Sequence, residues 1–263
     1  MDSIKSQSHL EHPVFGQIKD YMEFYEMFSF STMGWNKRGL VSAINIDTYV
    51  FSSMQGTLES IRDVLKNLRI ADAYSLLRRY YDSTIINVYT NLYLEENFTF
   101  ETYYVPEIND WLEGKKKIPE YRFMSSYIRN SSRLSTITAL LFQDDRYKNI
   151  RERCNDHTHY NYYEHVLIND NEIVMVDRIK MLDTFSKDLE AIFIQHLSQI
   201  FYLNDHYLMS SDYIDHLDAG LPPPEGSEQF VAAFIQDIYD RILKVKRPDI
   251  ADEIKNHTAM KLI

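Results

Sequence analysis

Residues 71–94 read ADAYSLLRRYYDSTIINVYTNLYL, and their apolar and aromatic positions recur every three or four residues. In a helix of 3.6 residues per turn, this spacing places one set of side chains on a single face. That face comprises Ala73, Leu77, Tyr80, Tyr81, Thr84, Ile85, Val88 and Leu92. The stretch therefore predicts a long amphipathic helix that buries this face against other helices.

The same spacing extends over most of the chain. It predicts further helices over residues 14–30, 40–68, 120–142, 144–160, 175–210 and 227–246, and a short last helix that begins at Pro248. Residues 166–176 are the best strand candidate, although a helix–helix connection explains them equally well. With only seven glycines in 263 residues, Rossmann and β/α-barrel folds are disfavoured. The sequence predicts an all-α protein, an up-and-down helical bundle.

Residues 220–227, GLPPPEGS, are the clearest break in the pattern. Residues 95–119 also resemble a linker, with two prolines and one glycine. We expect a bundle domain over residues 1–219, followed by a linker and a C-terminal helical appendage over residues 220–263.

The composition limits the function classes. A formal net charge of −11 excludes a protein whose whole surface binds nucleic acid or an anionic membrane, and the sequence carries no DNA-binding signal. No apolar run approaches the ~18 residues of a membrane span, and the N-terminus lacks a signal-peptide pattern. The single cysteine, Cys154, suits a reducing compartment. We expect a cytoplasmic protein without membrane contact.

Positive charge gathers in one segment. Residues 114–153 hold ten basic and four acidic residues, including the run Lys115, Lys116 and Lys117. Two interpretations remain open. The charges either cover solvated helix faces or form a surface that faces phosphate. In the second interpretation the three lysines bind the substrate.

Residues 151–165, RERCNDHTHYNYYEH, form the one dense polar stretch. Histidine gives and takes a proton near neutral pH, and arginine holds a phosphate with two hydrogen bonds while it stays charged. The two together suffice for phosphodiester transfer without a metal ion. This stretch is therefore the candidate site.

Within it, the spacing from Arg153 to His159 (RCNDHTH) resembles the motif of the HEPN superfamily (higher eukaryotes and prokaryotes nucleotide-binding), whose helical bundles carry an arginine, four to six residues and then a histidine. Arg151 and His157 have the same spacing. We prefer the first pair because Asn155 lies between the arginine and the histidine, and because the motif histidine begins the sequence HYN (residues 159–161). The resemblance covers residues 40–210.

The resemblance implies a HEPN-like fold and a metal-independent endoribonuclease that acts as a homodimer, with two motifs meeting across the bundle interface. His159 is implied to move the proton of the ribose 2′-hydroxyl, Arg153 to hold the scissile phosphate, and Asn155 to orient the pair. Arg151 and Tyr160 are expected to bind the RNA beside them. No metal or cofactor is required, and a role as a toxin or defence effector follows by family analogy.

Other interpretations of the same residues stay open. The chain can be a catalytically inactive HEPN-like module that binds a nucleotide, RNA or a partner protein. Arg153 can also pair with Asp156 or Glu152 inside its own helix, which leaves His159 packed at the rim of the bundle.

A metal site is a weaker alternative. His157 and His159 form a His-x-His pattern with Glu164 and His165 nearby, similar to the first strand of polymerase-and-histidinol-phosphatase phosphoesterases. The pattern lies on a predicted helix midway along the chain, whereas that fold needs it on an early strand.

Two further patterns do not predict a site, one because of its spacing and the other because of its residue types. His196, His206 and His216 recur every ten residues, about 80° apart around a helix, and are interpreted as surface or rim histidines. Residues 34–39 have the glycine spacing of a phosphate loop, but Leu40 and Val41 stand where lysine and serine or threonine are needed.

Overall fold

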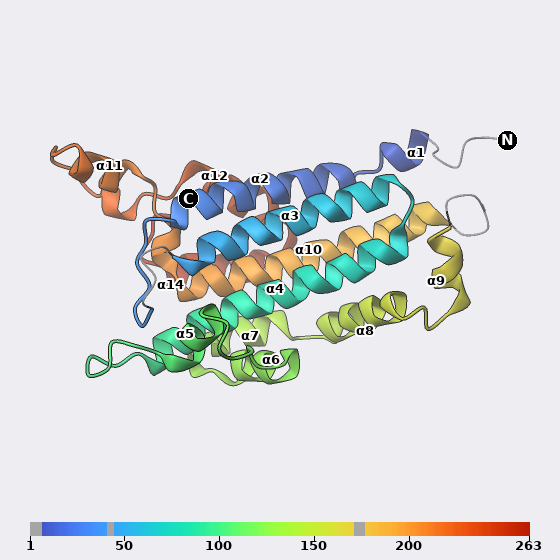
Figure 1. Ribbon diagram of the computed structural model, residues 1–263. Coiled ribbons are helices and arrows are strands. Elements are labelled where there is room, and N and C mark those ends of the chain that lie inside the picture. Colours follow the sequence, from blue (N-terminus) through green and yellow to red (C-terminus); the bar gives the residue numbers. More distant parts are fainter. Residues whose placement is uncertain (1–6, 41–44, 171–176) are drawn as a thin grey trace. The chain divides into compact units, whose positions relative to one another are not determined.

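The computed structural model describes residues 7–40, 45–170 and 177–263, and these residues are helical almost throughout (Figure 1). The α-helices are α1 (Gln7–Leu10), α2 (Val14–Thr32), α3 (Ile46–Lys66), α4 (Ile70–Asn97), α5 (Pro106–Leu112), α6 (Tyr121–Asn130), α7 (Ser135–Leu141), α8 (Arg146–Thr158), α9 (Tyr163–Ile168), α10 (Arg178–Leu203), α11 (Asp212–Asp218), α12 (Ala233–Ile238), α13 (Lys244–Lys246) and α14 (Pro248–His257). Short 3₁₀ turns lie at Ser132–Leu134, Asp205–Leu208 and Ser227–Gln229, and a π-helical turn at Tyr239–Leu243 joins α12 to α13. Over these ranges no strand forms, and one isolated antiparallel bridge links Met209 to Val231. The predicted all-α class is confirmed.

The helix predicted over residues 71–94 is confirmed as α4. All eight positions of its predicted apolar face are buried, each with at most 2% of its surface exposed. Helical periodicity alone therefore identified the packed face of the longest helix. Pro248 also begins α14 as expected, since proline lacks the N–H that the first helical turn leaves unpaired.

Several predicted helices are shorter than expected. The stretch 120–142 breaks after α6, where the Ser131 hydroxyl accepts a hydrogen bond from the Arg133 N–H at 3.3 Å and starts a new turn. The helix predicted over 175–210 ends at Leu203. Residues 95–119, expected to be a linker, contain α5, which begins at Pro106. The spacing of apolar residues does not predict a helix end that depends on a hydrogen bond from a single side chain, as at Ser131.

Residues 166–176, the best strand candidate in the sequence, form no strand where the structure describes them. Val166, Leu167 and Ile168 belong to α9, and residues 171–176 lie outside the described residues. A short apolar run fits a strand and a helical turn equally well, so its period alone did not separate them.

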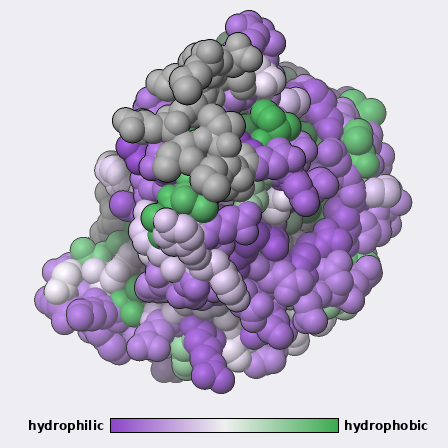
Figure 2. Space-filling model, turned by 90° about the vertical axis from the view of Figure 1, so that its right-hand side faces the viewer, coloured by the Kyte–Doolittle hydropathy of each residue, from purple (hydrophilic) through white to green (hydrophobic). Residues whose placement is uncertain are grey.

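Figure 2 shows one face of the molecule, on which hydrophilic residues predominate and hydrophobic residues form small, separate groups. None of the helices within the described ranges is long and apolar enough to cross a membrane.

The chain divides into two compact units, and α2, α3, α4 and α10 each contribute one part to either unit. The first unit comprises Met1–Glu26, Val50–Thr84 and Asp144–Phe193. In its core, Tyr21 stacks on Phe193 with ring centroids 3.7 Å apart, and the hydroxyls of Tyr25 and Tyr80 are hydrogen-bonded at 2.8 Å. Parts of three long helices thus meet through aromatic side chains, with α8 and α9 in the same unit.

The second unit comprises Met27–Tyr49, Ile85–Gln143 and Ile194–Ile263. Phe28 lies at its centre and makes edge contacts with Phe201, Tyr207 and Phe234. Phe234 comes from the segment that the sequence predicts as an appendage, so this segment packs against the core of the unit. The domain boundary between residues 219 and 220 stays a prediction.

Phe28 and Phe30, two residues apart on α2, give a matched test of this core. Phe28 is fully buried, whereas Phe30 is 67% exposed. Phe28→Ala is expected to lower the free energy of unfolding by about 3–5 kcal/mol because it leaves a cavity, and Phe30→Ala by no more than about 0.5 kcal/mol. Urea unfolding followed by circular dichroism measures both. Equal, small losses would contradict this core.

Candidate functional site

The motif arginine is anchored by a carboxylate from another helix. On α8, Arg153 donates from Nε and Nη2 to the two carboxylate oxygens of Asp188 on α10, each at 2.8 Å. Asp188 is buried, while the Arg153 side chain is 37% exposed. The hydrogen bonds to Asp188 raise the pKa of Arg153. Its Nη1 makes no hydrogen bond within the described residues, so one edge of a charged guanidinium is fixed and the other is free.

Tyr74 on α4 joins this pair and adds a stack of rings. Its hydroxyl donates to Asp188 at 3.2 Å, and its ring lies flat on His157 with centroids 4.1 Å apart. His157 stacks in turn on His165 at 3.9 Å. Burial, together with His165, lowers the pKa of His157 to about 3. His157 is therefore a neutral packing residue that holds α8 against α4.

The second motif histidine lies elsewhere. His159 caps the C-terminus of α8, where its N–H donates to the Asn155 carbonyl at 3.0 Å, and its side chain is exposed. Tyr160 follows in the left-handed conformation with φ +49°, also exposed. Six residues of helix rotate by about 600°, so α8 does not bring His159 to the face that holds Arg153. No hydrogen bond or ion pair joins the two in the described part of the chain.

The other residues of the motif take varied places. The Arg151 guanidinium donates to Asp82 at 2.6 Å, which engages the arginine of the alternative Arg151–His157 pair. Asn155 is half-buried, and in the residues described here its Oδ1 has no hydrogen-bond partner. The carboxylate that pairs with Arg153 is Asp188, in place of the intrahelical Asp156 or Glu152.

The residues of the metal alternative are packed rather than arranged around an ion. His157 and His165 lie ring on ring, and His159 is at the exposed end of α8. Across residues 7–40, 45–170 and 177–263, no group of three or more histidine, cysteine, aspartate or glutamate side chains is placed to hold a metal ion.

The basic segment is largely offset by carboxylates. Six of its ten basic side chains form ion pairs: Lys115 with Glu113, Lys116 with Glu107, Arg133 with Glu95, Arg146 with Asp144, Arg151 with Asp82 and Arg153 with Asp188. Two of the three lysines expected to bind phosphate thus already face carboxylates. Within the described ranges, Lys117, Arg122, Arg129 and Lys148 form no ion pair.

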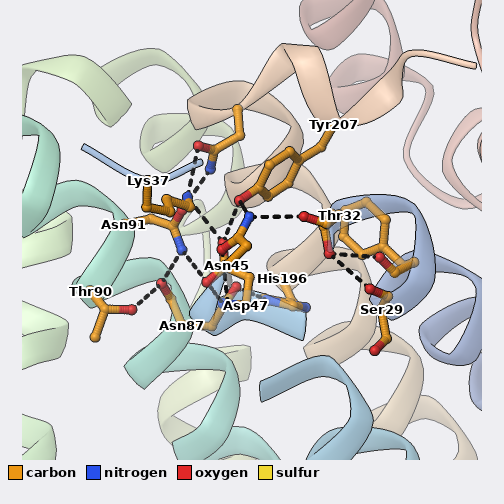
Figure 3. Close-up of polar contacts among 12 residues, drawn as sticks. Ser29, Thr32, Lys37, Asn45, Asp47, Asn87, Thr90, Asn91, His196 and Tyr207 are labelled. Carbon is orange, nitrogen blue, oxygen red and sulfur yellow. Dashed lines mark hydrogen bonds and ion pairs between the residues drawn. The ribbon is translucent and has the colours of Figure 1, made fainter. Parts of the chain in front are cut away.

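A second polar cluster, which the sequence did not reveal, surrounds Asp47 in the second unit (Figure 3). Asp47 is fully buried. Its Oδ2 accepts hydrogen bonds from Lys37 at 3.0 Å and Tyr207 at 2.7 Å. Its Oδ1 accepts from Asn87 at 2.8 Å and Asn91 at 3.0 Å. Four donors from three separate segments therefore compensate one carboxylate.

His196 extends this network, which corrects its interpretation as a surface residue. It is fully buried, and its Nε2 lies 2.9 Å from Asn87 Oδ1. Burial lowers its pKa to about 3. A histidine reads as polar in a sequence pattern, but a neutral imidazole with one hydrogen bond packs like an aromatic ring. His206 and His216 are partly exposed.

A cavity of about 360 Å³ adjoins the network. Its lining comprises Asn36, Lys37, Arg38, Asn91, Leu94, Glu95, Phe98, Asn204 and His206. Lys37 donates to the side-chain oxygens of Asn91 and, at 3.2 Å, Asn204, so these three residues belong to both the network and the cavity wall. Lys37 falls in the stretch 34–39 excluded as a phosphate loop, and its local sequence carries no sign of the distant Asp47.

No family model, curated protein or solved structure matches the chain. The resemblance to the HEPN superfamily therefore depends on the motif from Arg153 to His159 and on the helical pattern around it.

The Asp47 network predicts a large effect of a single substitution. Asp47→Ala leaves the nearly buried Lys37 charge without its carboxylate and is expected to cost about 3–5 kcal/mol of unfolding free energy. Asp240→Ala is the control, because its ion pair with Lys244 at 2.8 Å is exposed and is worth about 0–1 kcal/mol. Chemical denaturation of both variants tests this, and equal losses would show that the network does not stabilise the unit.

His157 and His196, both buried and both with a lowered pKa, predict acid sensitivity. Their folded pKa of about 3 lies below the ordinary histidine pKa of 6.5, so the unfolded chain binds more protons between these values. Their contribution to stability is complete above pH 6.5 and is lost as the pH falls towards 3. His157→Phe keeps the stacked ring but removes one titrating group. In urea unfolding at several pH values, it is expected to flatten the decline, and an unchanged slope would refute the assignment.

Proposed function

We propose that the chain is a HEPN-like endoribonuclease that cleaves RNA without a metal ion. The observation that carries this proposal is the guanidinium of Arg153. Asp188 fixes one of its edges with two hydrogen bonds and keeps it charged, and the free Nη1 is available to a phosphate oxygen. Arginine recognises phosphate through such a planar edge.

The proposed reaction is transesterification at one phosphodiester. His159 accepts the proton of the ribose 2′-hydroxyl, and the 2′-oxygen forms a bond to phosphorus. The bond from phosphorus to the 5′-oxygen breaks, that oxygen takes up a proton, and a 2′,3′-cyclic phosphate remains. Arg153 offsets the negative charge that grows on the non-bridging oxygens, and Asn155 orients the pair.

The surroundings of His159 support contact with RNA. Its side chain is exposed, and Tyr160, Tyr162 and Tyr163 after it are exposed as well. Exposed aromatic rings next to a proton-transfer group offer faces on which unpaired bases stack.

The rotation along α8 makes a second copy of the chain part of the proposal. One helix presents Arg153 and His159 on different faces, so a site with both groups at one phosphate needs two α8 helices that meet. A homodimer with the two motifs at its interface, as the resemblance implies, meets this need. A cytoplasmic location and a role as a toxin or defence effector belong to the same proposal.

The catalytically inactive alternative has its own supporting observation. Asp188 already offsets the charge of Arg153. The residue after this arginine is Cys154, which is completely buried, and burial raises its pKa to about 12. The motif then serves to hold α8 in place. The chain is in that case a module of the same fold that binds a nucleotide, RNA or a partner protein.

Purified protein incubated with mixed cellular RNA in excess EDTA tests the proposal. The wild type is expected to produce fragments with cyclic phosphate ends. His159→Ala is expected to abolish cleavage with an unchanged helical circular-dichroism signal and melting temperature, because an exposed side chain adds little to packing. His216→Ala is the control, because it removes a partly exposed histidine outside the motif. This variant is expected to remain active.

Each other outcome points to a different conclusion. Cleavage that the chelator abolishes contradicts metal independence. Full activity of His159→Ala rejects its role in catalysis. RNA binding by the wild type without any cleavage favours the inactive module.

A further inference from the structure

Two arginines of the basic segment lie on the same helix, and neither has a carboxylate partner within the described residues. Arg122 and Arg129 both lie on α6 in the second unit, and neither forms an ion pair within the described residues. Seven residues make nearly two turns, which places both on one helix face about 10 Å apart along the axis. Arg129 is held near the helix by the Ser125 carbonyl at 3.3 Å and by the Phe142 ring at 5.9 Å.

An exposed aromatic ring lies beside them. Phe123 is 56% exposed, although phenylalanine is usually buried. It contacts Tyr89 edge-on and Tyr127 in an offset stack, each with ring centroids 6.4 Å apart. Tyr127 is fixed in turn by its hydroxyl, which donates to Glu96. The ring of Phe123 is therefore supported from behind and presents free surface to solvent.

Two open cavities border this ring. One of about 720 Å³ is lined by Pro119, Glu120, Arg122, Phe123, Ser126 and Arg129. The other, of about 470 Å³, is lined by Glu96, Phe123, Ser126, Tyr127, Asn130, Ser131 and Ser132. Both linings include Phe123 and Ser126, so the two cavities adjoin along α6, and together they are called the α6 groove. The larger part has two arginines against one carboxylate. The smaller part has amide and hydroxyl groups and the Glu96 carboxylate, which accepts hydrogen bonds from Tyr127 and Ser131.

We infer that this α6 groove binds single-stranded RNA. Phosphates contact Arg122 and Arg129, a base stacks on Phe123, and the hydroxyl and amide groups beyond it offer hydrogen bonds to the next nucleotide. Arginines that lie beside an exposed aromatic face, as in the larger part of this groove, are an arrangement by which proteins hold unpaired strands. A duplex keeps its bases stacked on one another and gives Phe123 no partner. The choice of RNA over DNA rests on the proposed function.

In this groove Arg122 and Arg129 take the place of the lysine run as the phosphate contact. Lys115 and Lys116 face Glu113 and Glu107, so their charges are already offset. The pair Arg122 and Arg129 and the pair Lys115 and Lys116 therefore make a matched comparison. Substitution of either pair removes two positive charges from the same unit.

Anisotropy titration of a short fluorescent 2′-O-methyl RNA tests the groove, since this RNA lacks the nucleophile for self-cleavage. Arg122→Gln/Arg129→Gln is expected to weaken binding about tenfold and to reduce the salt slope by about 1.4, two single-strand phosphate contacts at ~0.7 each. Lys115→Gln/Lys116→Gln is expected to change neither value.

The stacking contact has its own pair of variants. Phe123→Ala is expected to weaken binding between about fivefold and a hundredfold, the range for loss of one base–aromatic stack. Phe100→Ala, which removes an even more exposed ring of the same unit, is expected to bind like the wild type. An RNA duplex of the same sequence is expected to bind more weakly than the single strand.

Wild-type affinity in both the arginine and the phenylalanine variants would overturn the inference, as would a larger loss in the lysine variant. Arginine-dependent binding to phosphatidylserine vesicles without RNA binding would overturn it as well. The uncleavable RNA separates the two proposals. Groove-dependent binding without cleavage of natural RNA keeps the groove and rejects the nuclease, whereas cleavage with binding insensitive to all groove variants rejects the groove alone.

Discussion

An ionised carboxylate removed from water must be compensated by charge and hydrogen bonds, because its desolvation otherwise costs several kcal/mol. Asp47 imposes this constraint on the second unit. Its partners are Lys37 before α3, two asparagines on α4 and Tyr207 after α10. Asn45 connects the same network to the start of α3, since its side chain accepts from the Asp47 N–H at 3.1 Å. One carboxylate thus fixes how several segments of this unit pack.

Asp188 imposes the same constraint in the first unit, with Arg153 and Tyr74 as its partners. This pairing bears directly on the candidate site. A side chain that acts on a substrate must be held in place by its neighbours, and the contacts that stabilise α8 also orient the guanidinium of Arg153. Structural and catalytic roles of this arginine are therefore compatible. The nuclease and the inactive module differ in whether Arg153 and His159 act together on one phosphodiester.

Among the twenty tyrosines, those that are buried and those that are exposed beside the motif have different surroundings. Buried tyrosines such as Tyr25, Tyr74 and Tyr239 give their hydroxyls to partners inside their own unit, as the burial of a polar group requires. Tyr160, Tyr162 and Tyr163 instead lie exposed after the motif helix. The number of aromatic residues in a sequence does not indicate whether the protein binds nucleic acid. The exposure of each ring at the surface does, because only an exposed ring can stack on a base.

The sequence by itself determined the helical class and the buried face of α4, because a helix of fixed pitch converts spacing along the chain directly into a face in space. It also selected the stretch from Arg151 to His165 as the densest polar region. The tertiary structure decided which charges are paired. Asp188 follows Arg153 by 35 residues and Asp47 precedes Tyr207 by 160, and no local pattern relates such positions. It likewise decided that His157 and His196 are packed and neutral, and that Arg122 and Arg129 are left without carboxylates among the described residues. Burial and pairing depend on which segments meet after folding, so they are properties of the packed chain rather than of any single stretch of it.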